Sequence, residues 1–415
     1  MTAYAGNARR VLIIVENLPV PFDRRVWQEA TALRDAGYVV SIICPIGKGC
    51  NKRYEEIAGI AIHRHPLPIE AEGALAYLVE YTCALFWEFV LAWKVLRKDG
   101  FDVIHACNPP DLIFLIGGFF KLFLKKRFIF DHHDINPELY EAKFHRRGFL
   151  YRLVLRLEKW SFKIADVSIA TNESYRRIAI ERGGMPSDRV FVVRSGPKLD
   201  RLKRMQPVES LKRGRRFLVG YVGVMGRQEG IDYLLRAIAH IVYQMNRRDI
   251  HFGLVGGGTS LEEMKRFASE LSVADYVTFT GRVPDEQMLE MLNTADICVN
   301  PDVANEMNDK STMNKIMEYM ALGKPIVQFD LTEGRFSARE ASLYAKPNDE
   351  RDLARCIVEL LDDPTRRTEM GAFGLRRVQN ELEWRFEIPK LLSAYDAAFS
   401  NRDLSDAKAT LSSHG

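Results

Sequence analysis

Short apolar segments alternate with helical segments along almost the whole chain, in two successive series. Residues 23–36 illustrate the helical segments, because Val26, Ala30 and Leu33 recur at the spacing of one helix face. The first series contains six segments with the length and composition of buried strands: 11–15, 39–44, 103–105, 128–130, 167–170 and 190–193. This alternation predicts a parallel sheet that is covered by helices on both faces.

The second series begins after a break in the pattern. Residues 194–216 contain Gly196-Pro197 and the charged run 212–216, which are typical of an interdomain segment. Five further strands are expected at residues 217–222, 252–255, 277–279, 297–299 and 326–329. A chain of 415 residues is long enough for two such domains with a core each. We predict two doubly wound α/β domains, and the cleft between such domains is the default ligand site.

Composition excludes several classes of protein. The formal net charge of +4 is too small by itself to indicate a nucleic-acid partner, and no recognition motif accompanies it. The six cysteines form no C-x-x-C pair, so neither a zinc site nor a disulfide framework is indicated. The apolar run at 11–15 is too short for a signal peptide, and charged residues interrupt the apolar stretch 74–96, which therefore cannot span a membrane. We expect a cytoplasmic protein.

Residues 296–327 carry the clearest functional pattern. An apolar strand ends at Asn300-Pro301, a polar loop follows, and a short helix with Lys315 and Glu318 precedes a second apolar strand. The loop and helix start of such a βαβ unit lie at the carboxyl end of the first strand, where open α/β sheets bind ligands. A cation one turn from a carboxylate suits a ligand with a phosphate and sugar hydroxyls.

Two glycine-rich turns between strand and helix lie in the same half of the chain, at residues 220–232 and 254–264. Gly223 and Gly226 allow close approach of a ligand to the backbone, and a helix start offers free N–H groups to an anion. Such glycines also occur simply as tight turns. Two of these turns beside the 296–327 unit favour a phosphate-bearing ligand.

Several blocks resemble family-4 retaining glycosyltransferases in their order and spacing. They include FDHHDINPEL at 130–139, LVGGGTSLEEM at 254–264 and EYMALGKPIV at 318–327. Residues 24–40 resemble the family's first helix and second strand, and residues 381–395 its final helix. The resemblance implies a GT-B fold, in which two Rossmann-like domains face a central cleft and a C-terminal helix crosses back to the first domain.

The domain organisation that we expect has five parts. They are an acceptor-side domain at 1–198, a linker at 199–216, a nucleotide-sugar-binding domain at 217–384, the crossover helix at 385–400 and a disordered tail at 401–415.

The resemblance also implies roles for residues of the donor side. Glu318 matches the second glutamate of the family's paired motif and is expected to accept hydrogen bonds from the nucleotide ribose, as a carboxylate suits a cis-diol. Lys310 stands where the family has the first glutamate. Asp309 beside it is a candidate for contact with the donor sugar. The N–H groups of Ser311, Thr312 and Met313 are expected to face the β-phosphate.

A second departure from the family concerns the cations that hold the diphosphate. Most relatives place an arginine and a lysine where this chain has Val224 and Glu229. We expect Lys315 and Arg227 to supply the missing charge, although an exposed, unengaged Lys315 is the alternative. No DxD-type motif is evident at a strand end, and the family resemblance implies metal independence, so neither a metal nor another cofactor is expected.

The catalytic candidates lie in the first half. By resemblance, His133 with Asp134 is expected to lie near the reaction centre, although the neighbouring His132 leaves the choice open. Asp23 and Arg24 are candidates for the acceptor side, and a helix-capping role for Asp23 is the alternative. No enzymic nucleophile is predicted.

Basic and apolar residues are mixed in residues 121–163, which predicts contact with an anionic membrane surface. The alternative is an ordinary helix whose leucines pack into the core. The leading hypothesis is a retaining glycosyltransferase of bacterial surface glycan biosynthesis, acting on a lipid-linked or polysaccharide acceptor at the inner face of the cell membrane. The alternatives are a nucleotide-sugar 2-epimerase of the same fold and a non-catalytic scaffold that binds sugar nucleotides.

Overall fold

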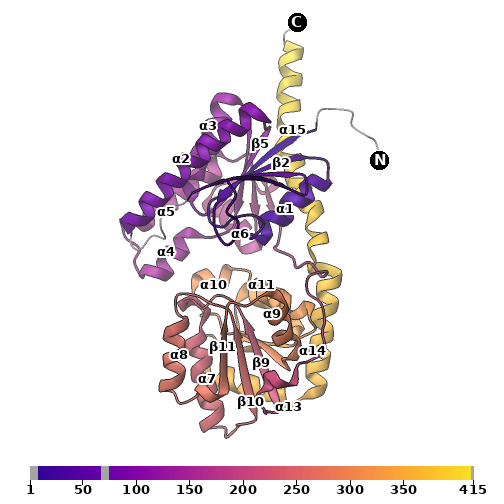
Figure 1. The fold of residues 1–415 in the computed structure, drawn as a ribbon. Coiled ribbons are helices and arrows are strands. Elements are labelled where there is room, and N and C mark those ends of the chain that lie inside the picture. Colours follow the sequence, from indigo (N-terminus) through magenta and orange to yellow (C-terminus); the bar gives the residue numbers. More distant parts are fainter. Residues whose placement is uncertain (1–7, 67–73, 413–415) are drawn as a thin grey trace. The chain divides into compact units, whose positions relative to one another are not determined.

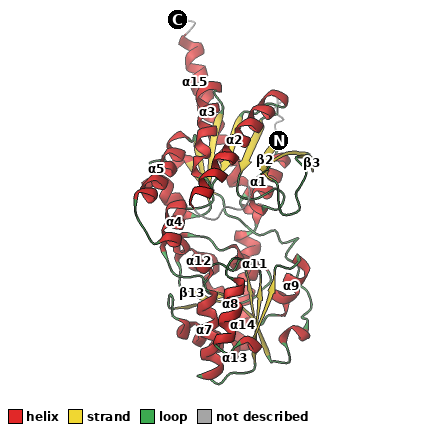
Figure 2. Ribbon diagram, turned by 60° about the vertical axis from the view of Figure 1, so that its left-hand side comes forward, coloured by secondary structure: helices red, strands yellow, loops and turns green. Residues whose placement is uncertain are grey.

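The computed structural model describes residues 8–66 and 74–412, and the chain forms two compact units (Figure 1). Unit 1 comprises Met1–Arg194 together with Glu387–Gly415, and unit 2 comprises Ser195–Phe386. Each unit is built on its own, largely parallel sheet with helices around it (Figure 2).

The sheet of unit 1 has eight strands in the order β3-β4-β2-β1-β5-β6-β7-β8. The strands are β1 (Arg10–Val15), β2 (Val39–Pro45), β3 (Tyr54–Ile57), β4 (Ile60–His65), β5 (Val103–Cys107), β6 (Arg127–His132), β7 (Val167–Ala170) and β8 (Val190–Val192). The helices of residues 1–194 are α1 (Arg24–Asp35), α2 (Ala74–Lys98), α3 (Phe114–Leu124), α4 (Asn136–Phe144), α5 (Phe149–Ile164) and α6 (Glu173–Arg177). All six strands predicted in the first series are confirmed, and all strand pairs except β3 with β4 are parallel.

The hairpin of β3 and β4 is absent from the sequence prediction. Its two-residue turn is Ala58-Gly59, and both residues have positive φ angles, 52° and 76°. Two positive φ angles are the requirement of a type I′ hairpin turn, but asparagine or aspartate normally occupies the first position. An alanine there gives no recognisable turn signal.

The sheet of unit 2 has six parallel strands in the order β11-β10-β9-β12-β13-β14. They are β9 (Phe217–Val222), β10 (Ile250–Val255), β11 (Val277–Gly281), β12 (Ile297–Asn300), β13 (Ile326–Phe329) and β14 (Ser342–Ala345). The helices are α7 (Ile231–Tyr243), α8 (Leu261–Glu270), α9 (Asp285–Thr294), α10 (Glu306–Lys310), α11 (Asn314–Ala321), α12 (Thr332–Ala338), α13 (Glu350–Asp362) and α14 (Pro364–Arg377). The five predicted strands are confirmed, and β14 is an additional edge strand.

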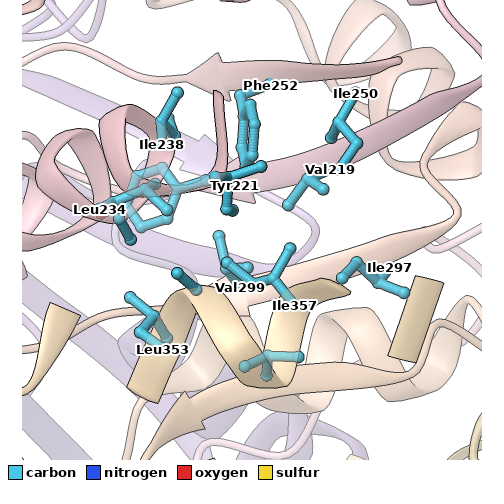
Figure 3. Close-up of a cluster of buried hydrophobic side chains, with 14 of the residues drawn as sticks. Val219, Tyr221, Leu234, Ile238, Ile250, Phe252, Ile297, Val299, Leu353 and Ile357 are labelled. Atoms are coloured by element: carbon cyan, nitrogen blue, oxygen red, sulfur yellow. The ribbon is translucent and has the colours of Figure 1, made fainter. Parts of the chain in front are cut away.

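Both faces of the unit 2 sheet are buried, as the continuous apolar strands predict. Val219 and Val299 point to the face that α7 and α13 cover, with Leu234 and Leu353 among the partners (Figure 3). Leu218 and Cys298 are one residue away along the same strands and therefore pack on the opposite face, with α9 and α11. This packing fixes α11, the helix of Lys315 and Glu318, at the carboxyl end of β12.

The C-terminal helix α15 (Ile388–Ser412) belongs to unit 1, where it packs against β7, β8 and α1 (Figure 1). Its side chains Leu391, Ala394 and Tyr395 are fully buried. This is the return of the chain to its first half that the family resemblance implied. The helix continues to Ser412 within the segment predicted to be disordered, and residues 413–415 lie outside the described part.

Candidate functional site

Lys315 lies in a buried ionic cluster at the carboxyl edge of the unit 2 sheet. Its ammonium Nζ is 2.6 Å from Glu229 Oε2 and 2.8 Å from Asp302 Oδ1, and it lies over the Tyr221 ring at 5.0 Å from the centroid. The Lys315 side chain is 10% exposed and Asp302 is 1% exposed. We call Lys315, Glu229, Asp302 and Tyr221 the Lys315 cluster.

The electrostatics of the Lys315 cluster are those of one cation shared by two carboxylates. Burial would lower the pKa of Lys315, but Asp302 and the other anionic groups outweigh it and keep this pKa well above its usual range. Burial, reinforced by Glu229, raises the pKa of Asp302 to about 7 although Lys315 opposes that shift. Asp302 Oδ2 has no hydrogen-bond partner among the described residues. The positive charge of Lys315 is therefore already matched inside the protein.

Glu318 lies on the same helix and contacts a residue that the sequence prediction missed. Its Oε1 accepts a hydrogen bond from Arg201 Nη2, and Arg201 Nη1 donates to Asp285 Oδ2 at 3.1 Å. Arg201 belongs to the segment predicted as a linker, where it stands among other basic residues and no motif distinguishes it. The structure thus brings the predicted ribose acceptor together with a cation other than Lys315 or Arg227.

The glycine-rich turn after β9 has a packing role in addition to its predicted role toward a ligand. A Cβ atom on Gly223 would lie 2.5 Å from the Tyr221 hydroxyl and 3.5 Å from Lys315 Nζ. The Lys315 cluster therefore requires the small residue. Gly226 and Arg227 line a groove of about 480 Å³ between α7 and α8, together with Arg236. Arg227 and Lys315, which were predicted to act together, thus have different surroundings.

The other loop candidates are engaged in local structure. Asp309 accepts hydrogen bonds from the Thr332 backbone N–H at 2.8 Å and its hydroxyl at 3.0 Å, which ties α10 to the start of α12. The Ser311 hydroxyl donates to the Met307 carbonyl at 2.7 Å. Thr312 and Met313 directly precede α11, with Met313 as its N-cap residue. The loop before α11 is therefore a pre-ordered turn.

In unit 1, His133 follows β6 and is held by a buried carboxylate. Its Nε2 is 2.5 Å from Asp131 Oδ2, and its side chain is 14% exposed. The side-chain carbonyl of Asn108 accepts from the backbone N–H groups of His133 and Asp134, at 2.7 and 3.1 Å. Burial raises the pKa of Asp134, against the opposing effect of His133. His132, the alternative candidate, is fully buried among aromatic rings.

Asp131 is the centre of a wider buried network. Arg25 Nη2 donates to its two oxygens at 3.0 and 3.3 Å, and His105 Nε2 lies 3.2 Å from Oδ2. His105 Nδ1 is in turn 2.7 Å from the hydroxyl of Tyr395 on α15. Burial would raise the pKa of Asp131, but Arg25 and the two histidines hold it well below its usual range. None of these supporting residues was predicted from a motif in the sequence.

The same network contains the residue types of a metal site. Atoms of Glu29, Cys107, Asp131 and His133 all lie within 4.8 Å of one another. However, the Arg25 guanidinium is 3.0 Å from both Glu29 Oε1 and Asp131 Oδ1 and supplies the positive charge that these carboxylates require. The group therefore fits a structural ion-pair network better than a metal centre.

The acceptor-side candidates lie at the start of α1. Asp23 is its N-cap residue, and Oδ1 accepts from the Val26 backbone N–H at 3.1 Å, which is the capping role that the sequence left open. Arg24 is the first helical residue and is exposed. It is the next residue, Arg25, that reaches the buried network beneath His133.

Helices α3 and α5 pack together and expose an apolar surface with a basic border. Leu122, Phe123 and Phe149 are 74%, 72% and 70% exposed, and Leu150, Leu153 and Trp160 are also exposed. The alternative, in which the α5 leucines pack into the core, therefore does not hold for Leu150 and Leu153. The exposed basic residues on α5 are Arg152, Arg156, Lys159 and Lys163. We call this the α3–α5 surface.

No helix in residues 8–66 and 74–412 is long and apolar enough to cross a lipid bilayer.

Two family models match the chain and together span most of it. Residues 23–201 match glycosyltransferase family 4, and residues 216–363 match glycosyl transferases group 1. Among curated proteins, the chain is 26% identical over 227 residues to 2-deoxystreptamine glucosyltransferase of Streptomyces kanamyceticus, covering 51% of this chain and 55% of that protein. The chain spans about half the length of the curated relatives it matches.

A second relative is a GDP-mannose-dependent alpha-(1-6)-phosphatidylinositol monomannoside mannosyltransferase of Mycolicibacterium smegmatis, with 30% identity over 203 residues, 46% of this chain and 50% of that protein. Among solved structures, sucrose-phosphate synthase from Thermosynechococcus elongatus superposes with a TM-score of 0.75 at 20% identity and covers 95% of this chain and 100% of that one. This likeness shows the two-sheet fold with its C-terminal helix, which is the GT-B fold.

Proposed function

This chain belongs to glycosyltransferase family 4, and from that premise we propose that it transfers a sugar from a nucleotide-sugar donor to a lipid-linked or polysaccharide acceptor with retention of configuration. The observation that carries the proposal is that both halves match glycosyltransferase models, the first half family 4 and the second half glycosyl transferases group 1. The M. smegmatis relative, whose name specifies a nucleotide-sugar donor and a lipid acceptor, supports the same chemistry.

Unit 2 is proposed to bind the donor. Glu318 accepts hydrogen bonds from the ribose hydroxyls, and the N–H groups of Thr312 and Met313, just before α11, face the diphosphate. The Ser311 N–H, which was predicted to join them, donates to the Asn308 carbonyl at 3.2 Å instead. Sugar transfer builds negative charge on the leaving diphosphate, which positively polarised groups must stabilise. Arg227 remains a candidate for that task. Lys315 contributes only to the extent that the donor diphosphate competes with Glu229 and Asp302 for the Lys315 ammonium.

Unit 1 is proposed to supply the acceptor side and the catalytic His133 with Asp134. Asp131 holds the His133 ring through Nε2, so Nδ1 is the ring atom left to face a substrate. The buried network of Arg25 and His105 fixes Asp131 in turn. Asp23 and Arg24 lie near the same end of the sheet and remain candidates for acceptor contact.

The α3–α5 surface is proposed to hold the enzyme on an anionic membrane at the cytoplasmic face. Exposed leucines and aromatic rings suit the acyl boundary, and the adjoining lysines and arginines suit anionic headgroups. A lipid-linked acceptor would place the enzyme at such a surface.

The test begins with thermal shifts of the wild-type protein in UDP-, GDP-, ADP- and TDP-sugars, since a ligand that binds only the folded state raises its stability. With the donor found in this way, Glu318→Gln is expected to weaken binding by roughly 10- to 100-fold, the range for a hydrogen bond to a charged group. Glu306→Gln, an exposed glutamate of the preceding helix, is the matched control and should bind normally. The proposal would be refuted if no nucleotide sugar raised the melting temperature of the protein. Epimer formed from donor alone would favour the 2-epimerase alternative.

A further inference from the structure

Arg201 is a component of the candidate nucleotide site that lies outside the sheet and its helices. The residue lies between β8 and β9, in the first part of unit 2. Its guanidinium is 27% exposed and bridges two helices, with Glu318 of α11 on Nη2 and Asp285 of α9 on Nη1. The Glu318 side chain is 16% exposed, so this ion pair is only partly screened by solvent.

The backbone around Arg201 is fixed by packing. Leu202 is 3% exposed and belongs to the core cluster that contains Ile316 and Met317 of α11. The Met205 backbone N–H donates to the side-chain carbonyl of Asn293 at 3.0 Å. This segment therefore behaves as part of the unit 2 core, and it presents Arg201 to Glu318 in a defined position.

The contact leaves Glu318 able to bind a diol. A carboxylate has two oxygens and about four acceptor positions, and Arg201 uses one of them on Oε1. The Arg201 contact therefore does not by itself exclude hydrogen bonds from the two hydroxyls of a ribose. A planar guanidinium that is itself fixed by Asp285 restricts the rotation of the carboxylate, so less freedom is lost when a ligand binds.

We propose that Arg201 is a positioning residue, which orients the Glu318 carboxylate for the ribose of the donor nucleotide. The inference rests on the proposed function, because it assumes that Glu318 is the ribose acceptor. It assigns part of the donor site to a segment that connects the two units in sequence. The opposite arrangement is a blocked site, in which Arg201 must leave Glu318 before a nucleotide binds. Removal of the Arg201 guanidinium would weaken nucleotide binding if Arg201 positions Glu318, and would strengthen it if Arg201 blocks the site.

The experiment measures the dissociation constant of the nucleoside diphosphate whose sugar donor stabilises the wild-type protein, by calorimetry. The variants are Arg201→Gln and Arg201→Lys, with Arg204→Gln as the control because Arg204 is an exposed arginine of the same segment. Arg201→Gln is expected to weaken binding about 10-fold. Arg201→Lys should recover part of that loss, and Arg204→Gln should match the wild type.

A double-mutant cycle separates positioning from a general structural effect. In a Glu318→Gln background, Arg201→Gln should cause no further loss, because Arg201 acts through Glu318. Equal losses in both backgrounds, unchanged affinity, or tighter binding would each overturn the inference. Thermal denaturation of each variant confirms that it is folded. If Glu318→Gln weakens binding and Arg201→Gln does not, only this inference fails, whereas normal binding by Glu318→Gln refutes the donor-site assignment itself.

Discussion

Substitution of Lys315 by methionine tests the charge balance of the Lys315 cluster. Methionine keeps most of the side-chain volume and removes the ammonium, so Glu229 and Asp302 lose the cation that now lies 2.6 and 2.8 Å away. Asp302 cannot turn to solvent, because it is 1% exposed. The stability of unit 2 should therefore decrease, and the decrease should depend on pH.

The size of the effect follows from the ionisation of Asp302. Removing one partner of a buried ion pair costs about 3–5 kcal/mol when the other partner stays charged. Burial raises the pKa of Asp302 to about 7, so at pH 6 this carboxyl is largely protonated and only the partly exposed Glu229 loses a counter-charge. We expect a loss of roughly 1–2 kcal/mol at pH 6 and of about 3–5 kcal/mol at pH 9.

Thermal denaturation followed by circular dichroism measures this difference. A domain of this size shifts its midpoint by about 2–4 °C per kcal/mol, so the variant should melt roughly 6–20 °C below the wild type at pH 9. Lys310→Met is the matched control, since Lys310 forms a partly exposed i,i+4 ion pair with Glu306 on α10, and it should cost less than about 0.5 kcal/mol at both pH values.

A second substitution in the same background identifies the cause. Asp302→Asn removes one of the two carboxylates, so the double variant Lys315→Met with Asp302→Asn should recover most of the loss at pH 9. The reasoning is refuted if Lys315→Met costs the same at pH 6 and pH 9, or if the asparagine gives no recovery. Either result would mean that the charges of this cluster are solvated more fully than their burial indicates.

Two further predictions concern unit 1. Glu88 is fully buried, and burial together with Glu16 raises its pKa to about 8, so the folded state holds this proton more tightly than the unfolded state. Wild-type stability should fall as pH rises from about 5 to about 8, by at most about 1.4 kcal/mol per pH unit, and Glu88→Gln should lack this component in urea denaturation. On α5, Leu150→Glu with Leu153→Glu should abolish cosedimentation with phosphatidylglycerol vesicles and leave the melting temperature within about 2 °C, because both side chains are exposed; retained binding would contradict the membrane proposal.

Most strands and their parallel arrangement could be predicted from the sequence because β-branched and other apolar residues occur in short runs between helical segments. The runs 11–15 and 217–222 are examples, and both became central strands. The β3–β4 hairpin could not be predicted, since its Ala58-Gly59 turn lacks the usual residues. A prediction from local sequence depends on the usual backbone preferences of each residue type. Ala58 departs from the preference of alanine, because its φ angle is positive.

The sequence by itself determined that Lys315 and Glu318 lie on a helix at the carboxyl end of a strand, because that placement follows from the order of strand, loop and helix. Only the tertiary structure decided what their charges contact. Lys315 pairs with Glu229, 86 residues away, and Glu318 with Arg201, 117 residues away. Parallel strands bring distant loops to one edge of the sheet, but the pairing of individual charges depends on packing such as that of Leu202 against α11, which no local pattern encodes.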